Sequence, residues 1–282
     1  MSSRDFRELL DARSREGKFL CVGFDPDITK IPAAVKKSGV RETLIAFNRA
    51  IVDATKDIPS TFKLNSAFYE AYGSEGVLAL RDSIDYMHEA APGVIVLLDA
   101  KRGDIGNTNE MYARSAFDEL GADAVTVNPY MGGEPLEAFF AHKNKGIIVL
   151  CHTSNPGASE LQEAMVGSEP LYQVVARKSL DWNKNGNCCV MVGATYPEQL
   201  GEVRAIVGDM PILIAGIGAQ NGELEKTIQL GKNSKGQGLI INATRAIIYA
   251  SSGADFAQAA QKKAQEYDGA IRAALIESPA TV

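Results

Sequence analysis

The sequence predicts a single α/β domain folded as a (β/α)8 barrel of the TIM type, and three observations favour this fold. Eight short apolar runs occur along the 282 residues, which is the number of strands in such a barrel. A segment with helical spacing of its apolar residues follows most of these runs. No linker or low-complexity stretch divides the chain, whereas an open doubly wound sheet would need fewer strands or a visible second domain. One barrel domain over residues 1–282 is therefore expected.

The predicted strands are continuous apolar runs rather than alternating ones. This pattern is typical of parallel strands that are buried on both faces. Along the chain the runs occupy residues 19–23, 61–64, 94–98, 124–127, 147–150, 188–192, 212–215 and 239–241.

The segments between the runs repeat apolar residues at steps of three and four, as in Leu44, Phe47 and Ile51. A short helical extension is expected before the first strand. The connection over residues 152–170 is the longest and is rich in Ser, Gly, Pro and Glu. After a barrel strand such a loop is a candidate active-site lid, and the alternative is a tolerated surface insertion. The main helices are expected within 44–54, 77–87, 110–120, 171–182, 197–207, 224–230 and 254–276.

The composition is that of a globular protein with a sizeable core. Hydrophobic residues make up 45% of the chain and charged residues 23%, and the formal charge is −6. Without a dense Lys/Arg run, we expect no nucleic-acid surface. The apolar runs are too short to span a membrane, and residues 1–15 lack the apolar stretch of a signal peptide, so a cytoplasmic location is expected.

The cysteines and histidines do not form a metal-binding pattern. The four cysteines show no CxxC spacing and lie in or beside apolar runs, so we interpret them as buried reduced thiols. His152 adjoins the end of the fifth strand without two partner ligands in view. No metal site is predicted.

Polar residues follow several of the predicted strands directly. Because the carboxyl ends of the strands meet at one mouth of a parallel barrel, these residues should converge there. They are Asp25 after the first strand, Lys63 within the second, Asp99, Lys101 and Asp104 after the third, Ser154 after the fifth, Gly218 and Gln220 after the seventh, and Arg245 after the eighth.

Two groups among these residues suggest a functional site, one through paired charges and the other through phosphate binding. Asp99 and Lys101 stand two apart and would share one face of an extended segment, with Lys63 and Asp104 continuing an alternation of charge. Such pairing keeps the amines protonated and the carboxylates ionised, and the alternative is a salt-bridge network that only stiffens the barrel mouth. The glycine-rich turn near Gly218, together with Arg245, suits a phosphate, and the alternative is a tight turn that needs glycine.

Several segments of the predicted site resemble those of a known family. Asp99-Ala100-Lys101-Arg102-Gly103-Asp104 is similar to the DxKxxD signature of the orotidine 5′-phosphate decarboxylases, and residues 98–108 resemble the branch common in bacteria. DxKxxD alone is shared with sugar-phosphate enzymes of a wider superfamily, but the full set of similar segments is specific. The others are Phe24-Asp25-Pro26, Phe62-Lys63-Leu64-Asn65, Thr153-Ser154-Asn155-Pro156-Gly157, and the segments around Gly218, Gln220 and Arg245.

The resemblance implies decarboxylation of orotidine 5′-phosphate to UMP in de novo pyrimidine biosynthesis, with no cofactor. Lys101 would protonate C6 of the pyrimidine, Asp99 would lie against the departing carboxylate, and Lys63 and Asp104 would complete the charged array. Asp104 and Thr108 would reach the neighbouring subunit's site, which implies a homodimer. The substrate-binding residues would be Asp25 and Lys63 toward the ribose, Ser154 toward the pyrimidine, and Gly218, Gln220 and Arg245 toward the phosphate, with Asn65 also contacting the substrate.

Three alternatives stay open at this stage. A sugar-phosphate decarboxylase or aldolase of the same superfamily would place an extra acidic residue near the motif for Mg²⁺, where this chain has Arg102. A silent barrel that binds or senses UMP would tolerate loss of Asp99, Lys101 and Asp104, which are all present. Half of a fused pyrimidine enzyme would need a phosphoribosyltransferase partner, and nothing in this chain resembles one.

Overall fold

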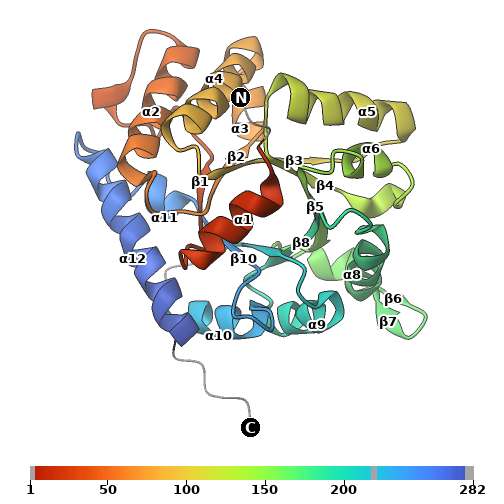
Figure 1. Ribbon diagram of the computed structural model, residues 1–282. Coiled ribbons are helices and arrows are strands. Elements are labelled where there is room, and N and C mark those ends of the chain that lie inside the picture. Colours follow the sequence, from red (N-terminus) through yellow and green to blue (C-terminus); the bar gives the residue numbers. More distant parts are fainter. Residues whose placement is uncertain (1–3, 217–220, 277–282) are drawn as a thin grey trace.

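Eight parallel strands close into a barrel in the computed structural model, which describes residues 4–216 and 221–276 (Figure 1). The strand order around the barrel is β1-β10-β9-β8-β5-β4-β3-β2. The predicted barrel and all eight predicted strands are confirmed, and β3 continues past its predicted end at 98. The strands are β1 (Leu20–Phe24), β2 (Thr61–Asn65), β3 (Ile95–Arg102), β4 (Ala124–Val127), β5 (Gly146–His152), β8 (Cys188–Gly193), β9 (Ile212–Ala215) and β10 (Leu239–Ala243).

Helices surround the barrel (Figure 1). The bounds of α8 and α9 match the predicted ranges, whereas the predicted helix 110–120 begins earlier, as α5, and ends as a π-helical turn at Ser115–Glu119. The main helices are α2 (Val40–Thr55), α4 (Gly73–Ala90), α5 (Gly106–Arg114), α8 (Leu171–Trp182), α9 (Pro197–Val207), α10 (Asn221–Gly231) and α12 (Phe256–Ile276). Short turns are η1 (Ala33–Val35), α3 (Ala67–Glu70), η3 (Pro129–Met131), α6 (Glu137–Phe140), α7 (Ala158–Leu161) and α11 (Arg245–Ile248). None of the helices in the described ranges is long and apolar enough to cross a bilayer.

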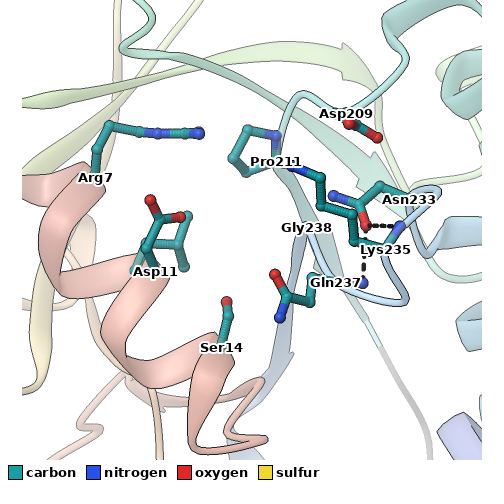
Figure 2. A pocket seen from close by; sticks show the side chains of 10 residues that line it. Arg7, Asp11, Ser14, Asp209, Pro211, Asn233, Lys235, Gln237 and Gly238 are labelled. Carbon is teal, nitrogen blue, oxygen red and sulfur yellow. Dashed lines mark hydrogen bonds between the residues drawn. The ribbon is translucent and has the colours of Figure 1, made fainter.

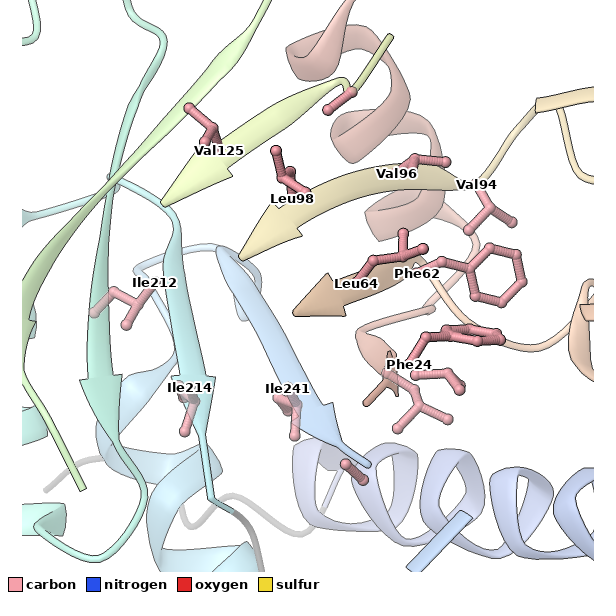
Figure 3. Close-up of a cluster of buried hydrophobic side chains, with 14 of the residues drawn as sticks. Phe24, Phe62, Leu64, Val94, Val96, Leu98, Val125, Ile212, Ile214 and Ile241 are labelled. Atoms are coloured by element: carbon pink, nitrogen blue, oxygen red, sulfur yellow. The ribbon is translucent and has the colours of Figure 1, made fainter. Parts of the chain in front are cut away.

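The strands are buried on both faces, which explains their continuous apolar runs. One set of alternate residues, including Phe62, Leu64 and Val96, packs outward against the helices (Figure 3). The other set, including Ile95 and Leu97, fills the barrel interior. All four cysteines lie buried in strands as free thiols, as predicted.

Helix α1 (Phe6–Arg15) covers the amino-terminal end of the barrel. Its Phe6 and Leu10 side chains are buried against the interior strand residues. Gly146 at the start of β5 accommodates this helix, because a Cβ there would lie 2.8 Å from the Phe6 ring. Just before α1, Arg4 donates two hydrogen bonds of 2.8 Å to the Asp123 carboxylate ahead of β4. The segment is thereby tied to the barrel by packing and by charge.

A small pocket of about 130 Å³ lies at this same end of the barrel, between α1 and the loops that lead into β9 and β10 (Figure 2). Cationic and anionic side chains face each other around it. It is lined by Arg7, Leu10, Asp11, Ser14, Asp209, Pro211, Asn233, Lys235, Gln237 and Gly238. This pocket is separated from the carboxyl ends of the strands by the filled barrel interior.

The long connection after β5 is partly structured. It contains α7 and an antiparallel hairpin formed by β6 (Met165–Val166) and β7 (Glu169–Pro170). The hairpin lies at the periphery beside α8 (Figure 1). The part nearer the barrel mouth is held by Gln162, whose Oε1 accepts a 2.7 Å hydrogen bond from the Thr153 N–H.

Candidate active site

Asp99 is the centre of a charged cluster at the carboxyl ends of β2, β3 and β4. The Lys63 ammonium lies 3.0 Å from its Oδ2, and the Lys101 ammonium lies 2.6 Å from its Oδ1. The hydroxyl of Thr126 on β4 donates a third hydrogen bond, of 2.8 Å, to the same Oδ1. The structure thus brings Lys63, Asp99 and Lys101 together in alternating charge, as expected from the convergence of the strand ends and from the spacing of Asp99 and Lys101.

Thr126 is a site residue that the sequence analysis did not identify. Besides donating to Asp99, its hydroxyl accepts a hydrogen bond of 2.9 Å from the Lys101 N–H. It therefore fixes both the carboxylate and the backbone that carries the amine. The available signal was a lone hydroxyl in the apolar run Ala124–Val127, on the same face as Ala124.

The backbone at Lys101 adopts an unusual conformation. Its φ is +48°, in the left-handed region that non-glycine residues rarely occupy, and the pairing of β3 with β4 shifts register between Leu98 and Arg102. Strain of this kind costs on the order of 1–3 kcal/mol and is found preferentially at functional sites. The Lys101 amine therefore contacts Asp99 while the Lys101 side chain as a whole remains 40% exposed at the open barrel mouth.

The electrostatics of the cluster keep its members charged. Burial alone would raise the pKa of Asp99, but the Lys63 and Lys101 cations outweigh it and hold that pKa at about 2. Burial would likewise lower the pKa of Lys63, yet the Asp99 and Asp25 carboxylates raise it above its ordinary value. A fixed, ionised carboxylate thus lies between two ammonium groups.

Asp25 follows β1 and faces the same cluster. Its Oδ1 lies 3.9 Å from the Lys63 ammonium and is buried without a hydrogen-bond partner in the described residues. Burial raises the pKa of Asp25, an effect only partly offset by Lys63. A buried carboxylate oxygen that lacks a donor is suited to a ligand hydroxyl. Asn65, next to Asp99 in the strand register, accepts a 3.3 Å hydrogen bond from the Ala67 N–H.

Asp104 lies outside the charged cluster of its own chain. Its Oδ1 accepts a 2.7 Å hydrogen bond from the Ile105 N–H, and within the described ranges no ion pair includes its carboxylate. Asn109 of α5, which is fully buried, bonds both the N–H and the carbonyl of Asp104. The predicted alternation of charge therefore stops at Lys101 within one chain, because the turn after β3 directs Asp104 away. Thr108, in the first turn of α5, is half-buried.

Ser154 lies at the exposed end of β5, tightly against β8. A Cβ on Gly193 would lie 2.6 Å from the Ser154 Cα, so only glycine fits beneath it. The ring of His152, two residues earlier, is fully buried and its Nε2 lies 3.1 Å from Glu163 Oε1. In the described ranges, no group of three or more His, Cys, Asp or Glu side chains could hold a metal ion.

Arg245 begins α11 directly after β10, with its side chain exposed at the same end of the barrel. Gly216, which follows β9, has a φ of +88°. Gly218 and Gln220 lie outside the described residues. Of the three residues predicted to bind the phosphate, Arg245 is the one whose position the structure describes.

Comparisons with known proteins agree with this geometry. Residues 18–263 match the family described as orotidine 5′-phosphate decarboxylase / HUMPS. The chain is 48% identical over 258 residues to orotidine 5′-phosphate decarboxylase of Ralstonia pickettii, covering 91% of this chain and 94% of that protein. It is also 48% identical over 263 residues to the protein of the same name from Azoarcus, covering 93% and 96%.

Solved structures give the same result. The fold is similar to OMP decarboxylase of Leishmania donovani, with a TM-score of 0.81 and 36% identity over 95% of this chain and 98% of that one. It is also similar to UMP synthase of Leishmania donovani, with a TM-score of 0.84 and 36% identity, and covers 58% of that longer chain. By sequence, fold and the arrangement of its charged residues, this chain belongs to the orotidine 5′-phosphate decarboxylase / HUMPS family.

Proposed function

We propose that this protein decarboxylates orotidine 5′-phosphate to UMP, with Lys101 as the proton donor. The observation that carries the proposal is the position of Asp99, which holds the Lys101 ammonium at 2.6 Å while that amine stays open to the barrel mouth. The names and the near-complete coverage of the relatives support orotidine 5′-phosphate over a sugar phosphate as the substrate.

The proposed chemistry needs only charged side chains. The bond between C6 and the carboxylate breaks, carbon dioxide leaves, and the electron pair stays on C6. The Lys101 ammonium stabilises this charge as it develops and then transfers a proton to C6. The substrate carboxylate would approach the ionised Asp99, which disfavours the ground state more than the transition state. Lys63 keeps Asp99 ionised from the other side.

The proposed contacts to the substrate come from several strands around the barrel mouth. Asp25, with its unpartnered Oδ1, would accept a hydrogen bond from a ribose hydroxyl, with Lys63 and Asn65 beside it. Ser154 would contact the pyrimidine. Gly218, Gln220 and Arg245 would bind the phosphate, whose binding energy can order the site. The proposed lid is the portion of 152–170 nearest Ser154, since the β6–β7 hairpin packs beside α8.

We further infer a homodimer in which Asp104 and Thr108 complete the neighbouring site. Exposed large apolar side chains near Asp104 support an interface there, because monomers rarely expose such groups together. Asn128, just before η3, bonds Arg102 through its N–H, which brings the β4 loop beside the turn that carries Asp104. The exposed apolar side chains of the inferred interface are Ile105 (61% exposed), Met111 (58%), Tyr130 (79%) and Met131 (53%). The four free thiols suit a reducing compartment such as the cytoplasm.

The decisive test is to follow the loss of orotidine 5′-phosphate absorbance with purified protein, in the presence and absence of EDTA. Turnover that is unaffected by EDTA is expected. Activity that EDTA abolishes would favour a Mg²⁺-dependent sugar-phosphate enzyme, and UMP binding without any turnover would favour a silent binding protein. Either result would overturn the proposal.

A further inference from the structure

One side-chain hydroxyl, that of Tyr249, bonds the backbone at both Asp25 and Asp27, and the Tyr72 hydroxyl accepts a 3.2 Å hydrogen bond from the Ile28 N–H further along the same turn. The Tyr249 hydroxyl donates a 3.1 Å hydrogen bond to the Asp25 carbonyl and accepts one of 2.6 Å from the Asp27 N–H. The O–H of Tyr249 thus donates on one side of the turn, and its oxygen accepts on the other side. Because Asp25 Oδ1 has no hydrogen-bond partner among the described residues and its ion pair with Lys63 is long, at 3.9 Å, the side chain's position depends on how this backbone is held.

The Tyr249 ring is itself firmly placed. It stacks on Phe47 of α2 at a centroid distance of 6.0 Å and an interplanar angle of 19°, and Phe47 stacks in turn on Phe256 of α12 at 5.6 Å. Burial raises the pKa of Tyr249 to about 12, so the hydroxyl keeps the proton that it donates to Asp25 at any physiological pH. The Tyr249 hydroxyl is therefore held in place by its ring and stays protonated, so that it can bond the turn on both sides of Asp25.

Tyr249 also belongs to the segment that carries Arg245. It ends the short helix α11, and its N–H bonds the carbonyl of Arg245 at a distance of 3.2 Å. One residue therefore connects the Asp25 turn after β1 to the Arg245 turn after β10, which lie 220 positions apart in the sequence but on adjacent strands. No other side-chain hydrogen bond to the backbone of Asp25 is present in the described ranges.

We propose that Tyr249 is a positioning residue that sets the separation between Asp25 and Arg245. It would fit that separation to a ligand with a ribose hydroxyl at one end and a phosphate at the other. The inference rests on the proposed function, because that function supplies the ligand contacts of Asp25 and Arg245. Tyr249 itself touches neither end of the ligand and acts through these two residues.

The test is a double-mutant cycle on UMP affinity, measured by calorimetry, with Tyr249→Phe, Asp25→Ala and the double variant. Tyr249→Phe keeps the ring stacked on Phe47 and removes only the two hydrogen bonds. We expect it to weaken UMP binding about tenfold and to raise KM for orotidine 5′-phosphate more than it lowers kcat. In the Asp25→Ala background the same change should weaken UMP binding less than about twofold, because without the Asp25 side chain there is no longer a separation from Arg245 that Tyr249 can set.

A second readout tests the coupling of the two ends. The ratio of uridine Kd to UMP Kd measures what the phosphate contributes, and it should fall in Tyr249→Phe if Arg245 is no longer held at the right separation. Tyr86→Phe is the matched control, since its hydroxyl bonds the exposed Asp53 away from the site, and it should change neither UMP affinity nor the ratio.

The outcomes separate this inference from the proposed function. Unchanged UMP affinity in Tyr249→Phe, or an equal loss in both backgrounds, would overturn the positioning role even if the protein is an active decarboxylase. An Asp25→Ala variant that binds UMP normally would instead overturn the substrate contacts proposed above. A thermal unfolding curve for each variant identifies any loss caused by unfolding, and binding is compared at a temperature where all variants are folded.

Discussion

The Lys63 ammonium lies 3.0 Å from Oδ2 of Asp99, and only 4% of each side chain is exposed. An apolar pair of similar volume is often as stable as a buried ion pair, so stability alone does not require these charges. The arrangement instead fixes an ionised carboxylate next to the more exposed Lys101 amine. Substitutions in the buried Lys63–Asp99 pair and at the exposed Lys101 amine are therefore expected to have different consequences.

Lys101→Ala should lower kcat by about a thousandfold or more, since it removes the group that stabilises and protonates the developing charge at C6. UMP affinity, measured by calorimetry, should stay within a few fold of the wild type. The control is Arg102→Ala, whose side chain pairs with Glu70 rather than with Asp99 and should leave kcat nearly unchanged. Turnover of Lys101→Ala within tenfold of the wild type would contradict the assigned role.

A mixture of Lys101→Ala and Asp104→Ala chains should recover activity, although each variant alone is nearly inactive. If Asp104 serves the neighbouring site, a mixed dimer has one site with both residues intact. Random pairing then gives about a quarter of wild-type activity after the chains are mixed, unfolded and refolded together. No recovery is expected if Asp104 serves its own chain, so an inactive mixture that still forms dimers would exclude the shared site.

Ile105→Glu should convert the protein from dimer to monomer. The side chain is 61% exposed beside Asp104, and a charge placed in an apolar interface core is strongly unfavourable. Sedimentation velocity would measure the change, and activity should fall with the dimer fraction. Met165→Glu in the β6–β7 hairpin alters an equally exposed residue on the far side of α8 and should leave the assembly intact. A fully dimeric Ile105→Glu protein would place the interface elsewhere.

Gly193→Ala should raise KM for orotidine 5′-phosphate, because the added Cβ would lie 2.6 Å from the Ser154 Cα and must displace it. Steady-state kinetics should show a larger effect on KM than on kcat if Ser154 contacts the pyrimidine. Gly201→Ala on α9 is the matched control, since the nearest atom to its new Cβ lies at an ordinary 3.5 Å. Equal kinetics for the two variants would argue against a role for the Ser154 position.

Arg4→Ala should destabilise the fold by on the order of 3 kcal/mol at neutral pH, because it leaves the Asp123 carboxylate buried without its main partner. Burial would raise the Asp123 pKa, but the His88 ring, whose Nε2 lies 3.5 Å from Asp123 Oδ2, and the two hydrogen bonds from Arg4 lower it from 3.8 to about 2. A carboxylate with a lowered pKa contributes stability above its unfolded-state pKa and loses that contribution as the pH falls toward the folded-state value.

The stability difference between wild type and Arg4→Ala should therefore be full above about pH 5 and narrow between about pH 4 and pH 2. Urea unfolding at about pH 7 and about pH 3 would measure it. Arg15→Ala changes an exposed residue on the adjacent helix α1 and should have little effect at either pH. A difference that does not depend on pH would show that Arg4 acts through packing rather than through Asp123.

Local features of the chain were sufficient to predict the barrel. Most strands contain a run such as residues 147–150 in β5, whose apolar residues are consecutive in the sequence, and burial on both faces is readable from the run itself. The spacing of Asp99 and Lys101 likewise predicted that the two side chains meet, although the left-handed φ of Lys101 shows that the segment which carries them is not regularly extended. These properties depend only on residues that are close in the chain.

The contacts between residues that are distant in the sequence could be found only from the closed barrel. The Thr126 hydroxyl reaches Asp99 only because β4 pairs with β3, and Tyr249 reaches Asp25 only because β10 closes on β1, 224 positions away from the carbonyl that it bonds. The left-handed φ of Lys101 and the exclusion of Asp104 from the cluster follow from the register shift at the end of β3. Sequence spacing determined which residue types lie at the barrel mouth, whereas strand pairing and register determined which of their atoms meet, because hydrogen bonds depend on distances that chain separation does not encode.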